Sequence, residues 1–197
     1  FEDSIEIAVF DDGLQDSSIN YDLKFVCFNN IKWIGNGFLI PAGPLREKIE
    51  NICKYDAIFL NGNEENNDDL KKKIRKYNSN IKIFETYYVP NNLNKFDKTE
   101  KFLVFSGIGN PDSFKKTLIK NNLNIIEELK FPDHHLYTSS DIIEIKSHAK
   151  KLNAKILTTE KDYIKIDQCH IDEIDFLGID LIVKNEDELI NFIKSKI

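Results

Sequence analysis

The feature that most constrains the fold is an alternation of short apolar runs with polar, helix-favouring segments. Runs rich in β-branched and aromatic residues occupy residues 5–10, 23–28, 57–60 and 81–88, and we expect each to be a strand. Between the last two, residues 68–77 are charged and favour a helix, as expected of a surface crossover. This alternation predicts an α/β fold with mainly parallel sheets.

The second half of the chain repeats the pattern with clearer helix signals. A buried-type run at residues 102–105 is followed by a glycine turn, with Asn110 as a helix cap and Pro111 in the first turn. Thr138 and Asp141 have the spacing of a capping box ahead of another helix. The remaining expected elements are strands at 125–129, 155–159 and 181–183 and a last helix capped by Asn185. We place a domain boundary in the Asn-rich stretch 90–94, giving domains 1–94 and 95–197.

Charge and cysteine usage exclude several classes of protein. The net charge of -6 argues against a nucleic-acid partner, because binders of a phosphate backbone gather Lys and Arg on one face. No apolar run reaches the roughly 18 residues that span a bilayer, and no signal peptide opens the chain. Cys27, Cys53 and Cys169 are widely spaced, which fits a reducing cytoplasm better than a disulfide framework or zinc site.

The start of the chain carries its own expectation. The sequence contains no Met and begins at Phe1, directly before an expected core strand. We therefore expect it to be an internal or carboxyl-terminal fragment of a longer protein, with an incomplete site.

Two adjacent carboxylates follow the first apolar run. In parallel sheets, ligands lie beyond the carboxyl ends of the strands, so Asp11 and Asp12 are expected at the edge of a site. Paired acids at such a place can hold Mg²⁺ beside a phosphate chain. Gln15 is close enough to orient a phosphate or a sugar hydroxyl. The alternative is an ordinary strand end with a solvated turn.

A second segment, G-N-G-F-L-I-P-A-G-P-L-R-E at residues 35–47, combines glycines and prolines that define an unusual loop. Such a loop places Arg46 and Glu47 with little entropy left to lose. The planar guanidinium of Arg46 suits phosphate because it can bind two oxygens at once. The alternative is a surface Arg-Glu pair, worth less than about 1 kcal/mol.

Three shorter segments complete the candidates. The turn at residues 106–111 lacks the Gly-Lys-Ser/Thr ending of a P-loop, and we expect a structural tight turn there. In Asp133-His134-His135, a histidine beside an acid can serve as a general base, bind a metal, or simply be a satisfied loop residue. Lys161, in T-T-E-K-D at 158–162, can offer a positive charge to phosphate or pair with its acidic neighbours.

Taken together and in this order, the five segments resemble the tetraacyldisaccharide 4'-kinase family of lipid A biosynthesis. The resemblance rests on D-D-G-L-Q, G-N-G-F-L-I-P-A-G-P-L-R-E, F-S-G-I-G-N-P, F-P-D-H-H and T-T-E-K-D, which extend over nearly the whole chain. It implies a P-loop-kinase-like parallel sheet remnant in residues 1–94 and a smaller α/β domain in 95–197.

The resemblance also implies an activity and roles for residues. The family transfers phosphate from ATP to the 4'-hydroxyl of a tetraacylated disaccharide 1-phosphate, giving lipid IV-A, at the cytoplasmic face of the inner membrane of Gram-negative bacteria. Asp11 and Asp12 then match acids near Mg²⁺, and His134 matches the histidine that assists a catalytic aspartate. Gln15, Arg46 and Glu47 match residues of the same cleft, and His135 is not expected to be essential. The implied partners are the lipid A disaccharide precursor and the membrane surface, with no nucleic acid and no obligate protein partner.

The chain departs from the family pattern in several places. Asp16 stands where many members have His, and the Walker A loop, the catalytic aspartate and a membrane-docking helix of the family are not found in this sequence. We therefore expect residues 1–197 alone to be inactive.

Two other interpretations stay open. One is a metal-dependent phosphoesterase with Asp11, Asp12, Asp133, His134 and His135 as ligands, and the other is a non-catalytic α/β relic of the kinase. The kinase interpretation requires that the paired acids and the imidazole of His134 converge on one cleft.

Overall fold

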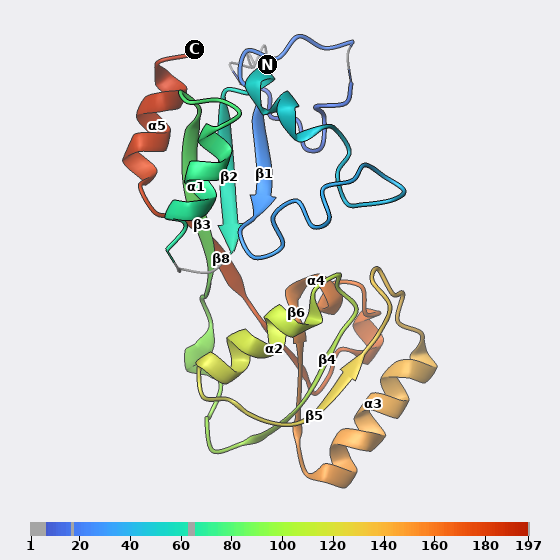
Figure 1. Ribbon diagram of the computed structural model, residues 1–197. Coiled ribbons are helices and arrows are strands. Elements are labelled where there is room, and N and C mark those ends of the chain that lie inside the picture. The colour runs from blue at the N-terminus through green and yellow to red at the C-terminus, as the bar shows by residue number, and fades with distance from the viewer. Residues whose placement is uncertain (1–6, 17, 63–65, 197) are drawn as a thin grey trace, which may run out of the picture. The chain divides into compact units, whose positions relative to one another are not determined.

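The computed structural model describes residues 7–16, 18–62 and 66–196. The chain divides into two compact units, the first formed by residues 1–87 and 181–197 and the second by residues 88–180. Each unit contains one four-stranded sheet, with strand orders β1-β2-β3-β8 and β5-β4-β6-β7 (Figure 1). The expected division at residue 94 therefore needs revision, because the last strand and helix return to the first unit instead of staying in the second.

The first unit is a three-layer arrangement of helix, sheet and helix. The pairings β1–β2 and β2–β3 are parallel, as predicted. Ile74 of α1 packs with Ile58 on one face of the sheet, whereas Phe192 of α5 contacts the rings of Phe25 and Phe84 on the other face. Its elements are β1 (Phe25–Asn29), β2 (Ala57–Gly62), α1 (Asp68–Arg75), β3 (Lys82–Pro90), β8 (Ile179–Val183) and α5 (Glu186–Lys194).

The second unit uses the same architecture around a more fully buried sheet. Its strands pair in parallel throughout, and alternate residues of β4 face opposite helices. Phe102 and Val104 pack with Phe114 of α2, whereas Leu103 and Phe105 pack with Ile142 of α3. Its elements are β4 (Lys101–Ser106), α2 (Pro111–Lys120), β5 (Asn124–Lys130), α3 (Ser139–Leu152), β6 (Lys155–Thr159), α4 (Glu160–Tyr163) and β7 (Ile174–Leu177).

Most of the expected elements are present, and the helix starts differ in how they are capped. Thr138 and Asp141 form the predicted capping box at the start of α3. Helices α2 and α5 begin after Asn110 and Asn185, as predicted, but neither side chain makes a capping hydrogen bond. The short strand β7 and helix α4 have no counterpart among the expected elements.

The strand expected at residues 5–10 is not found in its described part. Residues 7–10 are irregular, and Val9 is 91% exposed. A strand requires a neighbouring strand for its backbone groups, and the described residues offer none to this run. Residues 5 and 6 lie outside the described residues.

Candidate functional site

The two acids after the first apolar run lie in an exposed turn. Asp12 has a left-handed backbone with φ of 54°, an arrangement that Asp adopts more readily than most residues. The turn is held from the side, because the Tyr21 hydroxyl donates to the Gly13 carbonyl oxygen at 2.8 Å and its ring meets Phe10 edge-on. Asp11 and Asp12 therefore face solvent beside each other.

A compact loop, residues 35–45, carries Arg46 and Glu47 into the same unit. Backbone bonds cross the loop from Ile40 N to Leu45 O at 2.8 Å and from Leu45 N to Phe38 O at 3.1 Å. At Gly43, a Cβ would collide with the Phe38 carbonyl group, so this position requires glycine. The loop thus has its own hydrogen bonding, as its glycines and prolines indicate.

This loop and the acidic turn are joined through side chains. The Arg46 guanidinium forms an ion pair with the Asp12 carboxylate and also donates to Gln15 Oε1 at 3.3 Å. The side chains of Arg46 and Asp12 are 55% and 65% exposed, so the pair is open to water and to ligands. The structure thereby brings together three of the predicted site residues from segments about thirty positions apart.

Glu47 extends this cluster toward the following 3-10 helix, Ile49–Lys54. Its carboxylate accepts from Asn51 Nδ2 at 2.8 Å and from the Tyr55 hydroxyl at 3.1 Å. Hydrogen bonds from Asn51, Tyr55 and Gln15 lower the pKa of Glu47. Burial and the same bond to Glu47 raise the pKa of Tyr55 to about 12. Glu47 is thus held ionised by donors, and we name the set Asp12, Gln15, Arg46 and Glu47 the arginine cluster.

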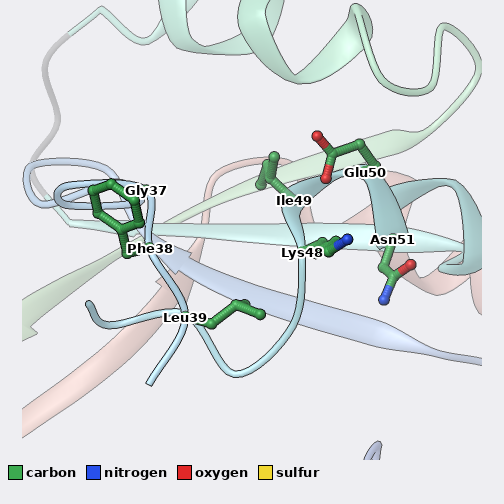
Figure 2. A pocket seen from close by; sticks show the side chains of 7 residues that line it. All are labelled: Gly37, Phe38, Leu39, Lys48, Ile49, Glu50 and Asn51. Carbon is green, nitrogen blue, oxygen red and sulfur yellow. The ribbon is translucent and has the colours of Figure 1, made fainter. Parts of the chain in front are cut away.

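An open pocket of about 500 Å³ lies beside this loop (Figure 2). Phe38 and Leu39 come from the loop, and Lys48 and Glu50 come from the segment after Glu47. Phe38 is 62% exposed, which is unusual for an aromatic side chain without a partner surface. The pocket therefore offers both apolar and charged groups next to the arginine cluster.

The remaining predicted segments meet at one edge of the second sheet. Strands β5, β4 and β6 are parallel neighbours, and their carboxyl ends carry F-P-D-H-H, S-G-I-G-N-P and T-T-E-K-D, respectively. Backbone bonds continue past the strands, from Phe131 N to Ser106 O at 2.9 Å and from His134 N to Gly107 O at 3.1 Å. The carboxyl edge of a parallel sheet is where such folds bind ligands.

The two histidines at this edge have different surroundings. The His134 side chain is 83% exposed, and its backbone is left-handed, with φ of 59°. Its ring Nε2 lies 3.9 Å from Asp133 Oδ2. The His135 ring packs against Phe131 and Tyr137 and lies 3.2 Å from the Asp141 carboxylate. His134 thus presents a ring to solvent, whereas His135 belongs to the packing around α3.

Sequence reasoning selected Lys161 from T-T-E-K-D and missed its neighbour Asp162. Lys161 is exposed, and no ion pair with another described residue is found for it. Asp162 is fully buried and accepts from Gly107 N at 2.9 Å and from Lys165 Nζ at 2.9 Å. The Thr-x-x-Asp spacing, identical to that of Thr138 and Asp141, was the available signal that Asp162 has a structural task.

The donors available to a metal ion are limited. Across residues 7–16, 18–62 and 66–196, no three His, Cys, Asp or Glu side chains gather as a metal-binding group. The phosphoesterase interpretation would need such a group of ligands, drawn from both units. Asp11 and Asp12 nevertheless fit Mg²⁺, which binds one or two carboxylates and completes its shell with water and phosphate oxygens.

The expected convergence of two of these groups stays a prediction. Asp12 lies in the first unit and His134 in the second.

In the described part of the chain, no helix combines the length and apolar character required to cross a bilayer.

The fold and the polar groups that follow its strands define the class of protein: an α/β protein with parallel sheets and groups suited to phosphate at the carboxyl ends of the strands. A family model described as LpxK, tetraacyldisaccharide-1-P 4'-kinase, matches residues 2–197. A tetraacyldisaccharide 4'-kinase of Pelagibacter ubique (strain HTCC1062) is 48% identical over 189 residues, covering 96% of this chain. One from Rickettsia typhi is 36% identical over 185 residues, covering 93% of this chain. The chain belongs to the tetraacyldisaccharide 4'-kinase family.

A solved structure agrees with the fold. LpxK from Aquifex aeolicus, in a crystal structure of the "apo" form in complex with ATP, superposes with a TM-score of 0.62 at 21% identity. The match covers 94% of this chain and 56% of that chain. The chain likewise spans 60% of the Pelagibacter ubique relative and 56% of the Rickettsia typhi relative.

Proposed function

We propose that this chain provides part of an ATP-dependent kinase that phosphorylates the 4'-hydroxyl of a tetraacyldisaccharide 1-phosphate, giving lipid IV-A. The observation that carries the proposal is the arginine cluster, in which Asp12, Gln15 and Arg46 meet although two separate segments supply them. Family membership supports it, because the Pelagibacter ubique and Rickettsia typhi relatives are named as this kinase.

Each group in the first unit has a task in this proposal. Asp11 and Asp12 would hold Mg²⁺ together with phosphate oxygens, and the bound ion would supply positive charge beside the phosphate chain. Arg46 can bind two phosphate oxygens at once. To do so, its exposed guanidinium would break its ion pair with Asp12 or keep that pair while it also binds the phosphate. Gln15 and Glu47 hold the orientation of this arginine and its loop.

The second unit provides the groups for proton transfer and charge. His134 has an exposed ring beside Asp133 and is suited to orient an acid that accepts the proton of the sugar hydroxyl. Lys161 is an exposed positive charge for phosphate. We assign the first unit, residues 1–87 and 181–197, to the kinase core, and the second unit, which carries D-H-H and T-T-E-K-D, to a second α/β domain.

The site of action follows from the substrate. A tetraacylated lipid resides in a membrane, so we propose peripheral contact with the cytoplasmic face of the inner membrane. The net charge of -6 does not favour a nucleic-acid partner, and the proposal requires no obligate protein partner.

The test uses two proteins. One is residues 1–197 alone, and the other is a chimera that joins this chain to the portion of the Pelagibacter ubique kinase that it does not match. With radiolabelled ATP and the lipid substrate, the chimera is expected to transfer phosphate, and the 197-residue chain alone is not. Asp12→Ala, Arg46→Ala and His134→Ala are each expected to lower the turnover of the chimera at least tenfold.

Other outcomes would contradict the proposal. Robust transfer by residues 1–197 alone would show that the unmatched portion is unnecessary. A folded chimera that binds ATP but transfers no phosphate would remove the kinase assignment. Release of phosphate from the lipid without ATP would favour a phosphoesterase instead.

A further inference from the structure

Asp162 is a buried carboxylate that accepts hydrogen bonds from outside its own short helix as well as from within it. It lies in α4 and has no exposed surface. Its Oδ2 accepts from the Thr159 hydroxyl at 2.7 Å and from Gly107 N at 2.9 Å, and its Oδ1 accepts from Lys165 Nζ at 2.9 Å. Burying a carboxylate is costly unless it is paired and hydrogen-bonded, and here both oxygens have partners.

The start of α3 shows what the same local pattern does elsewhere. There, Thr138 and Asp141 form a complete capping box, in which the acid accepts from the backbone N–H of Thr138 itself at 2.8 Å. At α4, one half of this arrangement is present, with Asp162 N donating to Thr159 Oγ1 at 3.1 Å. The Asp162 carboxylate instead accepts from the backbone N–H of Gly107, in the loop that follows β4. The same Thr-x-x-Asp pattern therefore links T-T-E-K-D to S-G-I-G-N-P at this site.

The contact continues from Gly107 to His134. Gly107 N donates to Asp162, and Gly107 O accepts from His134 N at 3.1 Å, so both backbone groups of this glycine are engaged. The packing leaves little slack, because a Cβ at Gly107 would lie 3.0 Å from the Tyr137 hydroxyl and 3.1 Å from the Pro132 carbonyl oxygen. Movement of Gly107 would therefore be transmitted to the D-H-H segment.

His134 needs such support. Its left-handed backbone is unfavourable for a residue with a side chain and persists only where surrounding contacts hold it. Its ring is 83% exposed, so side-chain packing contributes little to its placement. Its single backbone N–H is shared between the Gly107 carbonyl oxygen at 3.1 Å and Asp133 Oδ1 at 3.0 Å, and these two acceptors define where the residue lies.

We propose that Asp162 is a positioning residue for His134, acting through the backbone of Gly107. The inference rests on the proposed function only for the catalytic consequence, because the structural link can be measured without turnover. Lys165 Nζ lies 2.9 Å from the Asp162 carboxylate, and a charged carboxylate is a stronger acceptor for the Gly107 N–H than a neutral amide.

The first experiment measures amide hydrogen exchange in residues 1–197. Asp162→Asn is expected to speed exchange at Gly107 and His134 about tenfold, because a neutral amide accepts more weakly than a carboxylate. Val104, in the core of β4, should exchange as before. The matched control is Asp141→Asn, which alters a capping acid that touches His135 but neither Gly107 nor His134. Unchanged exchange at Gly107 and His134 in Asp162→Asn would overturn the inference.

The second experiment measures kinetics in the chimera. Asp162→Asn is expected to lower kcat at least fivefold with the KM for ATP within twofold, and Asp162→Ala is expected to lower kcat further. Where Asp162→Ala does not fold, the Asn variant decides. In a His134→Ala background, Asp162→Asn should cause no additional loss. Equal kcat loss in Asp162→Asn and Asp141→Asn would overturn the inference, since both would then be general effects on folding.

The two proposals fail in different ways. Full activity of His134→Ala would remove the proposed catalytic role of His134 while leaving the exchange result to judge the link. An inactive His134→Ala together with an unaffected Asp162→Asn would remove only the positioning role.

Discussion

In the first unit, Arg46 and Asp12 meet through side chains that are 55% and 65% exposed, whereas in the second unit Asp162 is fully buried and bonds to the backbone of Gly107. Exposed ion pairs contribute little to stability because water and salt screen them. A buried acid bonded to backbone and lysine is instead part of the core. The Arg46–Asp12 pair can therefore be broken at little cost in stability, whereas loss of the Asp162 contacts would leave buried groups without partners.

The largest expected effect tests the buried side of this comparison. Asp162→Ala should lower the free energy of unfolding by about 2–4 kcal/mol, because it leaves Gly107 N–H and Lys165 without their acceptor. Chemical denaturation of residues 1–197 measures this change. Asp141→Ala, which removes a partly exposed capping acid, should cost only about 1 kcal/mol. Equal losses would show that burial does not distinguish the two acids.

A smaller effect concerns the titration of Tyr55, which is hydrogen-bonded to Glu47 of the arginine cluster. Tyr55 should titrate with a pKa of about 12, because burial and the bond to Glu47 favour the neutral phenol. Its contribution to stability is complete below about pH 10, the ordinary tyrosine value, and is lost as the pH rises through about 12.

The titration can be followed by NMR of the tyrosine ring carbons, with Tyr55→Phe to assign the signal. Glu47→Gln should lower the pKa of Tyr55 while leaving it above the ordinary value, since burial remains. A Tyr55 signal that titrates as an ordinary tyrosine would contradict the Glu47 network.

The smallest expected effect concerns the ion pair itself. Arg46→Gln should change the free energy of unfolding by less than about 1 kcal/mol, and less still at high salt. The control Lys72→Gln removes a more exposed pair with Asp69 and should have a similar or smaller effect. A loss above about 2 kcal/mol for Arg46→Gln would mean that the arginine cluster is structural after all.

Several elements were predictable because their signals are local. The capping box of Thr138 and Asp141 and the proline-started helix α2 depend on residues three or four positions apart, so the sequence reveals them directly. The strands β4 and β6 were also predictable, since both faces of the sheet are covered and each strand has a buried apolar centre, F-L-V-F in β4 and I-L in β6. The candidate residues Asp12, Gln15 and Arg46 came from motifs, and the structure brings them together.

Other features depended on partners far along the chain. The run at residues 7–10 is as apolar as a strand, yet it lies exposed because no described strand pairs with it. The last strand, β8, joins the first sheet beside β3, a placement that no local pattern indicates. The Thr-x-x-Asp spacing indicates that Asp162 is a capping residue, but only the packed structure shows that its carboxylate is buried and accepts from Gly107.

The sequence by itself determined the parallel α/β class, most element positions and the family, because these follow from periodicity, caps and ordered motifs. Only the tertiary structure decided that the chain's end returns to the first unit and that Asp162 reaches Gly107 across 55 positions. The physical reason is that strand pairing and the burial of side chains lower the free energy of the folded chain, and both can bring together residues that are far apart in the sequence.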